Sequence, residues 1–576
     1  MKMRKHITGA AALLAAAAVM SCSAGSPREV RLDDYLEGAH TACDTAMAIR
    51  RAVEYAVSSK GSTLVLPGGT LEISDEYVKE KFLYISNNYP SSDCAKRIAF
   101  DLSGADGLTV EGNGTLLLFS GYVIPFHVEG ARNVTVRNLK VDFKRSSISE
   151  GVIADAGEGY SDLSFPHDYR IVFESGALVF MDARGNRYPY WSLLEYDPVR
   201  EEIAHYVRER AVGYNGIRGE KLDNGLIRIY HPGFSAAKGN VLVFGPLERR
   251  APGFFLESSS GITLEDVTMW QCPGMGVIAQ RSENILLDRM VVEPAPGSGR
   301  LTSVGADATH FINCRGLIHL RGCSFSCQWD DCTNIHGWYS VCRERLSSNS
   351  VLLWSNYRTD FAVPGMTMEL VDHSNMMPYG KAVVRGVEKL NSDLSIVTFA
   401  EDLPESLKTG DVLADAEADP DVIIEGCTFV KNRARGILIG SAGKVVVRDS
   451  YFHSAGSAIL FEGDGNFWFE RAGVRDVTIT GNSFVNCLHG SWEWGKACIE
   501  VHSGIPDRES SLYHSNITVT DNLFDGFDPR ILDMYCVDGL VFEGNTIRVN
   551  SDYTSDVPAD AGHFVTEHCR NVRISQ

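Results

Sequence analysis

The sequence lacks the cysteine spacing that a structural metal site needs. It has 14 cysteines but no C-x-x-C pair, and thirteen, an odd number, remain when Cys22 is set aside. The most closely spaced set alternates with apolar residues, which is typical of core packing rather than of a disulfide ladder or a zinc site. This set is Cys314, Cys323, Cys327, Cys332 and Cys342. We therefore predict no structural metal and no cofactor, although a few disulfide bridges would be compatible with an exported protein.

The sequence also lacks an excess of positive charge. Its 54 lysines and arginines stand against 74 aspartates and glutamates, which gives a net charge of −20 and a pI near 5.3. No basic stripe is present, and binding to phosphates requires clustered lysine and arginine. We therefore expect no nucleic-acid partner. With 44% hydrophobic residues among 576, the chain should form several domains or one elongated repeat.

Long hydrophobic runs are absent except near the N-terminus. There the basic stretch MKMRKH precedes ITGAAALLAAAAVM, which is too short to span a bilayer comfortably. Residues 1–21 are therefore interpreted as an export signal. The run ends in V-M-S-C, which resembles the lipobox of bacterial lipoproteins, so we expect Cys22 to carry a lipid that anchors the chain to the cell envelope as its only membrane contact. The alternative is an ordinary cleaved signal with a chance cysteine.

One short pattern recurs along the rest of the chain. Two apolar residues one apart are followed by two polar or glycine positions, then by a small or asparagine-like residue and another apolar one. Several neighbouring copies begin 23 residues apart. The ten copies begin at Leu108, Val134, Ile262, Ile285, Ile318, Val422, Val445, Val477, Ile517 and Leu540.

Each repeat supplies short alternating strands and a sharp polar turn, which is too little to bury its own apolar face. Helical periodicity is sustained only over residues 45–57. We therefore predict an all-β fold, a right-handed parallel β-helix with one coil per repeat. The helix at 45–57 would cover the open end of the stack, where unpaired strand edges invite aggregation.

Two gaps interrupt the repeat, and both are alternating and rich in turns. Each is predicted to be a small antiparallel β-barrel or sandwich inserted through a coil loop. Such insertions would wall or lengthen a binding cleft, or only add rigidity. The predicted division is 1–21 signal, 22–144 cap and first coils, 145–250 first insertion, 251–339 coils with the candidate catalytic residues, 340–418 second insertion and 419–576 C-terminal coils.

The stretch QWDDCTNIHG carries two adjacent aspartates, Asp330 and Asp331. Asp307 precedes Asp330 by 23 residues, one coil length. In a β-helix that spacing would place Asp307 and Asp330 at similar positions of adjacent coils, about 4.8 Å apart. Because adjacent residues of a strand point to opposite faces, Asp330 and Asp331 can both reach one cleft only where the backbone bends or bulges, and we predict such an irregularity.

Three carboxyl groups in one patch suit the cleavage of a glycosidic bond. One protonated carboxyl donates to the leaving oxygen, and an ionised one acts at the sugar carbon. Crowding of like charges drives their pKa values apart. Trp329 would offer an apolar face to a galactose-like ring, and hydroxyls would bond to polar neighbours: His310, Asn334, His336 and, from a later strand, Glu462. The alternatives are a packing role for Trp329, histidines stacked within the coils, and aspartates in a solvated turn.

The order Gly-Ala-Asp at Asp307, Gln-Trp-Asp-Asp at Asp330 and Asp331, then Asn-Ile-His-Gly resembles the signature of carbohydrate-active β-helix enzymes. The polygalacturonases of glycoside hydrolase family 28 are similar, but they carry Gly-His-Gly and a downstream Arg-Ile-Lys that this chain lacks. With its two insertions, its lipoprotein-like leader and its aspartate spacing, the chain more closely resembles the α-1,3-galactosidases of glycoside hydrolase family 110. The likeness covers nearly the whole mature chain.

This resemblance implies an exo-acting enzyme that removes terminal α-1,3-linked galactose, on blood-group-B-type or linear αGal glycans, by inversion and without a metal. Asp330 would be the general acid, and Asp307 and Asp331 would be the base or share that role. The stacked spacing alone is closer to the roughly 5 Å of retaining enzymes than to the roughly 6.5–9.5 Å of inverting ones.

Three other readings stay open. A polygalacturonase-like hydrolase should need lysine or arginine beside the aspartates to hold a uronate, and none lies within residues 328–337. A polysaccharide lyase would need a basic residue and often calcium. A surface β-helix could bind glycans without catalysis. Glu500 and Asp533 on later strands are further candidates for sugar contacts, and the oligomeric state is left open.

Overall fold

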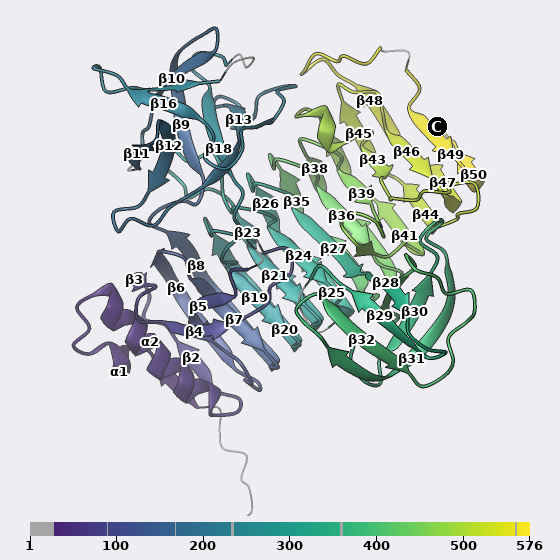
Figure 1. Ribbon diagram of the computed structural model, residues 1–576. Helices are drawn as coiled ribbons and strands as arrows, with labels where there is room; N and C mark the ends of the chain where they lie inside the picture. The colour runs from purple at the N-terminus through teal and green to yellow at the C-terminus, as the bar shows by residue number, and fades with distance from the viewer. Residues whose placement is uncertain are drawn as a thin grey trace, which may run out of the picture.

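The computed structural model describes residues 28–88, 90, 92–167, 169–231, 236–357, 361–558 and 561–575, and the predicted signal and Cys22 lie outside them. The backbone winds into a parallel β-helix whose coils stack from the N-terminal helices to the C-terminus (Figure 1). In the described part of the chain, no helix is long and apolar enough to cross a membrane.

Each coil contributes to two long sheets. The first two strands of a coil join a sheet of 21 strands, and the third strand joins a sheet of 13 strands. The third strands in the middle of the stack are β21 (Val277–Gln280), β24 (Thr309–Ile312), β27 (Thr333–Trp338), β36 (Ile437–Gly440), β39 (Ile459–Phe461) and β43 (Ile499–Val501). The candidate aspartates stand just before β24 and β27.

The repeat forms one continuous ladder of first strands. These strands are β8 (Arg132–Phe143), β20 (Ser260–Met269), β22 (Glu283–Asp288), β25 (Arg315–Arg321), β34 (Asp421–Glu425), β37 (Lys444–Arg448), β41 (Asp476–Thr480), β44 (His514–Thr520) and β47 (Val537–Glu543). The residues that begin the copies from Val134 to Leu540 are partners on successive strands. The predicted parallel β-helix is confirmed.

The N-terminal end of the stack is covered by two helices, α1 (Asp33–Leu36) and α2 (Ala42–Val57). Helix α2 begins at a capping box, in which Thr41 accepts from the Asp44 backbone N–H and the Asp44 side chain accepts from Thr41. Its apolar face buries Ile49 and Val53 against the first coils. The predicted cap is therefore present, and it starts three residues earlier than expected because the capping box lies before the apolar repeat.

The first insertion leaves the β-helix after β8 and returns at β19 (Phe254–Glu257). It is one antiparallel sheet of ten strands, in the order β11-β12-β16-β17-β10-β9-β18-β13-β14 with β15 beside β13, and it forms the upper left lobe of Figure 1. The strands are β9 (Ser149–Gly157), β10 (Tyr160–Ser164), β11 (Arg170–Glu174), β12 (Ala177–Met181), β13 (Tyr190–Asp197), β14 (Glu202–Ile203), β15 (Arg210–Ala211), β16 (Arg218–Lys221), β17 (Ile227–Tyr230) and β18 (Val241–Pro246).

The second insertion lies between β27 and β34 and is a closed barrel of six strands with its own core. Its strands are β28 (Ser340–Arg345), β29 (Ser350–Trp354), β30 (Thr367–Val371), β31 (Pro378–Lys389), β32 (Leu394–Phe399) and β33 (Val412–Asp415). Both insertions thus join the coils next to the candidate aspartates, one on each side along the chain.

The interior of the coils is filled by one continuous cluster of buried apolar side chains. Phenylalanines stack in register on neighbouring coils, as at Phe429, Phe452 and Phe484. The five cysteines predicted to pack in a core are all buried and unpaired, and none of the cysteines of the described residues forms a disulfide. The cysteines therefore serve as small apolar side chains.

Candidate functional site

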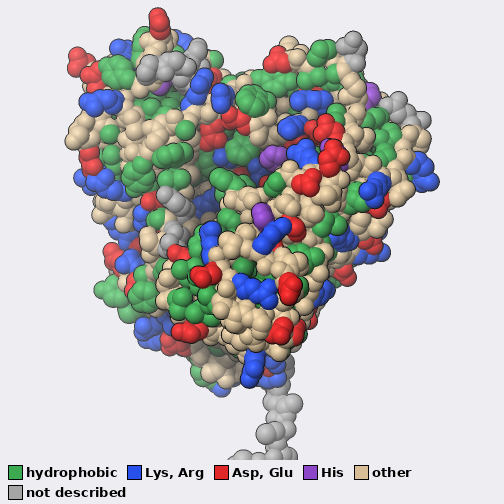
Figure 2. Space-filling view, turned by 45° about the vertical axis from the view of Figure 1, so that its right-hand side comes forward, with side chains coloured by type: hydrophobic (Ala, Val, Ile, Leu, Met, Phe, Trp, Pro, Cys, Tyr) green, Lys and Arg blue, Asp and Glu red, His purple; other side chains and the backbone are tan. Residues whose placement is uncertain are grey.

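A pocket of about 430 Å³ opens over the third strands of four successive coils, β24, β27, β36 and β39. Three carboxyl groups and three guanidinium groups meet at its base, and the molecular surface is hollowed between two lobes that show both charges (Figure 2). Its volume lies in the usual range of small-molecule sites, about 300–1,000 Å³. The charged side chains that line it are Arg249, Asp307, Asp330, Asp331, Arg433, Arg435, Glu462 and Glu470.

Asp330 and Asp331 lie outside regular strand, in a bent segment between β26 (Ser324–Ser326) and β27. Both line the pocket although they are adjacent in sequence. This backbone agrees with the irregularity expected from the sequence. The bend gives two neighbouring carboxyl groups access to one space, which a regular strand would deny to one of them.

The register between coils corrects one expectation. Strand β24 pairs Thr309 with Thr333 of β27, a step of 24 residues rather than 23. The partner of Asp307 on the next coil is therefore Asp331, not Asp330. The Asp331 backbone N–H donates to Asp307 Oδ1 at 3.4 Å, and the Ala308 N–H donates to the Asp331 carbonyl at 3.0 Å. The bent segment before β27 adds the extra residue, which the first-strand repeat did not reveal.

Arg435 continues the same column on the third coil. Strand β27 pairs Thr333 with Ile437, so the position of Asp331 matches that of Arg435. Asp331 Oδ1 accepts from the Arg435 backbone N–H at 2.9 Å, and Asp331 Oδ2 accepts from its guanidinium at 3.0 Å. Sequence reasoning missed this residue, because the second insertion separates it from Asp331. The repeat copies that begin at Ile318 and Val422 are also 104 residues apart. That offset, applied to Asp331, would have pointed to Arg435.

Asp330 faces two other arginines. Arg249, in the segment between β18 and β19, donates to Asp330 Oδ2 at 2.5 Å, and the Arg433 guanidinium lies 3.6 Å from Oδ1. The Asp330 side chain is 13% exposed, against 3% for both Asp307 and Asp331. Asp330 is therefore the carboxyl group nearest the mouth of the pocket, and the other two form its floor.

Burial and charge divide the three carboxyl groups. Burial, together with the Asp330 charge, raises the pKa of Asp307 to about 7. Burial also raises the pKa of Asp331 to about 8, despite the opposing Arg435. Burial acts in the same direction on Asp330, but Arg249, Arg433 and Arg435 hold its pKa below the ordinary value. In the free site, protons therefore reside on the Asp307–Asp331 pair, and Asp330 is ionised.

The charges around the triad favour acid–base chemistry over metal binding. Carboxylate oxygens of the three aspartates lie within 4.8 Å of one another, close enough to share a cation. Three guanidinium groups already lie against that cluster, and they would repel a divalent ion. A carboxyl group with a raised pKa beside an ionised one is the pairing used for proton transfer at neutral pH.

The two predicted histidines lie behind the aspartates. The His310 ring is 1% exposed, and its Nδ1 is 2.6 Å from Asp307 Oδ2. Its Nε2 is 2.9 Å from Nε2 of His336, whose Nδ1 bonds to the Gly337 carbonyl. Burial lowers the pKa of His310 to about 3 and that of His336 well below normal. His310 lines the pocket and His336 does not, so the expected sugar contact of His336 does not fit this placement.

Of the other residues predicted to bind the sugar, Asn334 and Glu462 line the pocket and Trp329 does not. The Trp329 ring is buried in a cluster that joins the first insertion to the coils, and it stacks on Tyr196 with ring centroids 6.3 Å apart. The stacking role predicted for Trp329 therefore disagrees with its position. Its neighbours in the bent segment turn toward the pocket, while its own side chain fills the interface behind them.

Sequence reasoning also missed the aromatic wall of the pocket. Tyr357 comes from the second insertion, whereas Trp468 and Trp494 come from loops of the C-terminal coils. Neither Glu500 nor Asp533 lines the pocket, and the Glu500 carboxylate instead accepts from Ser457 Oγ at 2.9 Å. These aromatic residues lie in segments outside the repeat, so the repeat pattern could not predict where they are in the fold.

Two family models match parts of the chain. The model described as "GLAA-B beta-barrel domain II" matches residues 356–413, and the "Right handed beta helix region" model matches residues 408–576. The first match lies over the six-stranded barrel and the second over the C-terminal coils. The description of the second model agrees with the predicted right hand.

Curated relatives match nearly the whole chain. Alpha-1,3-galactosidase B of Bacteroides thetaiotaomicron is 29% identical, over 100% of this chain and 94% of that protein. Alpha-1,3-galactosidase A of Shewanella woodyi is 29% identical over 96% of this chain and 92% of that protein. Alpha-1,3-galactosidase A of Bacteroides fragilis is 30% identical over 91% and 88%. These matches include the coils and both insertions.

Solved structures with similar folds are more distant. The family 28 exopolygalacturonase of Yersinia enterocolitica has a TM-score of 0.34 at 11% identity and covers 94% of this chain and 78% of its own. The endo-xylogalacturonan hydrolase of Aspergillus tubingensis has a TM-score of 0.38 at 10% identity, covering 94% and 98%.

Proposed function

The chain belongs to the family of the alpha-1,3-galactosidases, and on this premise we propose that it removes a terminal α-1,3-linked galactose with inversion, using the three pocket aspartates and no metal in the reaction. It is a glycoside hydrolase, and its substrates are glycans that contain α-1,3-linked galactose. The observation that carries the proposal is the convergence of Asp307, Asp330 and Asp331 at the base of one pocket.

We assign the proton donor to Asp330 because of its position. The sugar that leaves must depart through the mouth of the pocket, and Asp330 is the carboxyl group closest to that mouth. Asp307 and Asp331 lie side by side on the floor of the pocket, joined by a hydrogen bond from the Asp331 backbone N–H to the Asp307 carboxyl group. There they would hold and deprotonate a water molecule. Inversion requires this water to attack the anomeric carbon from the face opposite the glycosidic oxygen that Asp330 protonates.

The donor must receive a proton before it can give one. In the free site Asp330 is ionised because Arg249 lies against it. A glycosidic oxygen that takes the place of Arg249 would remove that stabilisation, and the nearby Asp307–Asp331 pair holds protons to pass on. Substrate binding would thus move a proton from the floor of the pocket to Asp330 and leave an ionised base behind.

The walls of the pocket support action at chain ends. Leu247 and Arg249 follow the first insertion, and Asn356 and Tyr357 belong to the second. These segments rise on either side of the coil face that carries the aspartates. Walls on both sides favour a terminal galactose that enters from the mouth over a polymer that lies across the face. Blood-group-B-type and linear αGal glycans both present such an end.

The stereochemistry of the first product tests the mechanism. Proton NMR recorded during hydrolysis of α-1,3-galactobiose should show β-galactose first, with the α-anomer appearing later by mutarotation. Initial α-galactose would mean retention, a covalent intermediate and a nucleophilic aspartate. The test is decisive because carboxylate oxygens within 4.8 Å of one another are closer to the roughly 5 Å of a retaining pair than to the roughly 6.5–9.5 Å of an inverting one. Running the linear disaccharide beside a fucose-branched blood-group-B trisaccharide would show which glycan is preferred.

Trp468 is proposed to support the sugar beyond the scissile bond. Its side chain lines the pocket and is 55% exposed at its rim. Replacing Trp468 by alanine should raise KM roughly 3- to 10-fold, as expected for an aromatic contact of about 0.5–1.5 kcal/mol, and should leave kcat little changed. Trp492 is exposed nearby and does not line the pocket, so Trp492→Ala is the matched control. Equal effects of both changes would remove this role.

The fold places basic side chains where a uronate substrate would need them. Arginine is absent from the sequence around the aspartates, but the fold brings Arg249, Arg433 and Arg435 to them. A basic pocket therefore does not separate the two hydrolase readings. The family assignment separates the two readings, because the relatives are alpha-1,3-galactosidases. The measurement that checks it compares hydrolysis of α-1,3-galactobiose with hydrolysis of polygalacturonate under the same conditions.

We also propose export and lipid attachment at Cys22. The support is the basic and apolar leader followed by V-M-S-C. In cells that process lipoproteins, mass spectrometry of the mature N-terminus should find an acylated Cys22, and Cys22→Ser should move the enzyme from the membrane fraction to the soluble one. An unmodified N-terminus at another residue would contradict the proposal.

A further inference from the structure

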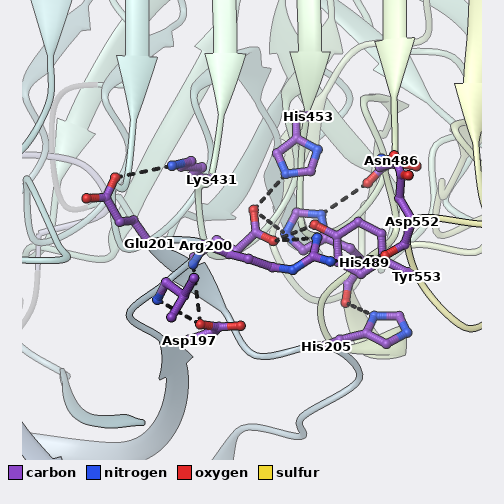
Figure 3. Close-up of polar contacts among 12 residues, drawn as sticks. Asp197, Arg200, Glu201, His205, Lys431, His453, Asn486, His489, Asp552 and Tyr553 are labelled. Atoms are coloured by element: carbon purple, nitrogen blue, oxygen red, sulfur yellow. Dashed lines mark hydrogen bonds and ion pairs between the residues drawn. The ribbon is translucent and has the colours of Figure 1, made fainter. Parts of the chain in front are cut away.

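A second polar cluster joins the first insertion to the C-terminal coils, away from the aspartates (Figure 3). Glu202 comes from β14, His453 from β38 (Tyr451–His453), and His489 from the loop after β42 (Ser483–Val485). One Glu202 oxygen and one ring nitrogen from each histidine lie within 4.8 Å of one another. Side-chain exposure is 3% for Glu202, 13% for His453 and 0% for His489.

The imidazole rings of His453 and His489 both point Nε2 toward Glu202. His453 Nδ1 donates to the Val485 carbonyl at 2.9 Å, and His489 Nδ1 donates to the Asn486 carbonyl at 3.1 Å. Both Nε2 atoms are left on the side of Glu202 Oε2, at 2.7 Å for His453 and 3.9 Å for His489. Metal-binding histidines are typically fixed by such an N–H bond to a backbone carbonyl.

His489 Nε2 is a buried polar atom without a hydrogen-bond partner. Because Nδ1 carries the proton, Nε2 presents a lone pair, and a buried lone pair without a partner is costly. The two rings are stacked with centroids 4.4 Å apart, so neither can turn away easily. The lone pair points into the space that His453 Nε2 and Glu202 Oε2 also face.

The Glu202 carboxylate is oriented from its other oxygen. Tyr553 donates its hydroxyl to Glu202 Oε1 at 2.5 Å, and the Arg200 guanidinium lies 4.0 Å from the same atom. Oε2 is thereby aimed at the imidazoles. Three ligand atoms from three chain segments, each held by a partner on its far side, form a pre-organised set.

We propose that Glu202, His453 and His489 bind a zinc ion that fastens the first insertion to the C-terminal coils. Two imidazole nitrogens and one carboxylate oxygen are a typical zinc set, with water as the fourth ligand. Calcium and magnesium prefer oxygen ligands only, so they should bind poorly. On binding, the metal replaces the proton that His453 Nε2 otherwise shares with Glu202 Oε2.

The site would act on the pocket at a distance. His489 lies a few residues before the 3-10 turn Trp492–Trp494, and Trp494 lines the pocket beside Arg433. On the other side, β14 belongs to the sheet that leads back to Arg249. A metal between these segments would therefore fix the distance between two walls of the pocket. The expectation of no structural metal rested on cysteine spacing, which does not detect ligands contributed by separate coils.

The test uses the full-length enzyme, freed of metal with a chelator and then titrated with Zn²⁺ against a competing chromophoric chelator. We expect one Zn²⁺ per chain, little competition from Ca²⁺ or Mg²⁺, and a rise in the thermal unfolding midpoint on metal addition. His453→Gln and His489→Gln should each lower the affinity by more than the roughly 10- to 100-fold typical of outer-shell changes, and should abolish the rise in midpoint.

His319→Gln is the matched control, because His319 forms a similar pair with Glu425 at 2.9 Å and, among the described residues, no third ligand completes a set there. This variant should bind Zn²⁺ as the parent does. The proposal is overturned by a parent enzyme that binds no stoichiometric Zn²⁺, or by folded His453→Gln and Glu202→Gln variants that bind it with parental affinity. Binding by the parent is measured without any substitution, so a variant that fails to fold does not block the test.

Discussion

Replacing Asp330 by asparagine should lower kcat on α-1,3-galactobiose by about 10²- to 10⁴-fold, the usual contribution of a general acid. An amide cannot protonate the departing sugar oxygen. On α-galactosyl fluoride, whose leaving group needs no proton, the same variant should lose far less activity. Steady-state kcat values for the two substrates, measured with one enzyme preparation, give the comparison.

The two floor aspartates provide the contrast. Asp307→Asn and Asp331→Asn remove the water-binding pair, so they should lose activity equally on both substrates. The opposite result would be activity on α-galactosyl fluoride that is retained in one of these two variants and lost in Asp330→Asn. That residue would then be the proton donor, and the roles argued from exposure would be reversed. Circular dichroism of each variant would show that the coils are intact.

Replacing Arg435 by methionine should have the second largest effect. Arg435 bonds to Asp331 through its guanidinium, and its charge lowers the pKa of that carboxyl group. Without it the Asp331 pKa should rise above about 8, and the carboxyl group should lose a positional restraint, which together should cost roughly 10²-fold in kcat near neutral pH. The Arg435 backbone N–H bond to Asp331 remains.

The direction of the pH change follows from the role of the floor pair. A base must be ionised, so a higher Asp331 pKa moves the acidic limb of the pH profile of kcat/KM to higher pH. Arg448→Met is the matched control, because Arg448 is 49% exposed and pairs with Glu425 on the outer face of the coils. An unchanged acidic limb in Arg435→Met would mean that Asp331 does not titrate in the reaction.

The repeat made the fold predictable from sequence, because identical strand positions recur and the ladder from Val134 to Leu540 keeps that order in space. The repeat spacing also predicted that Asp307, Asp330 and Asp331 lie close together. The error of one residue in their stacking arose because third strands follow bends whose length varies between coils, as before Thr333. First-strand spacing therefore does not fix third-strand register.

The arginines beside the aspartates could not be predicted from the sequence for a different reason. Arg435 is a neighbour of Asp331 only because the second insertion leaves the stack and returns to the next coil. Arg249 approaches from outside the coils altogether, after the first insertion. Trp329 shows the reverse case. It is adjacent to Asp330 in sequence, but its side chain is buried in the interface between the first insertion and the coils. Local sequence could not distinguish these outcomes.

The most direct measurement is a crystal structure of the Asp330→Asn variant with α-1,3-galactobiose bound. The proposed mechanism predicts the terminal galactose in the pocket, its glycosidic oxygen about 2.6–3.2 Å from the side chain at position 330, and its anomeric carbon facing Asp307 and Asp331 across one water molecule. A sugar bound elsewhere on the coils, or a glycosidic oxygen that faces position 307 or 331 instead, would contradict it.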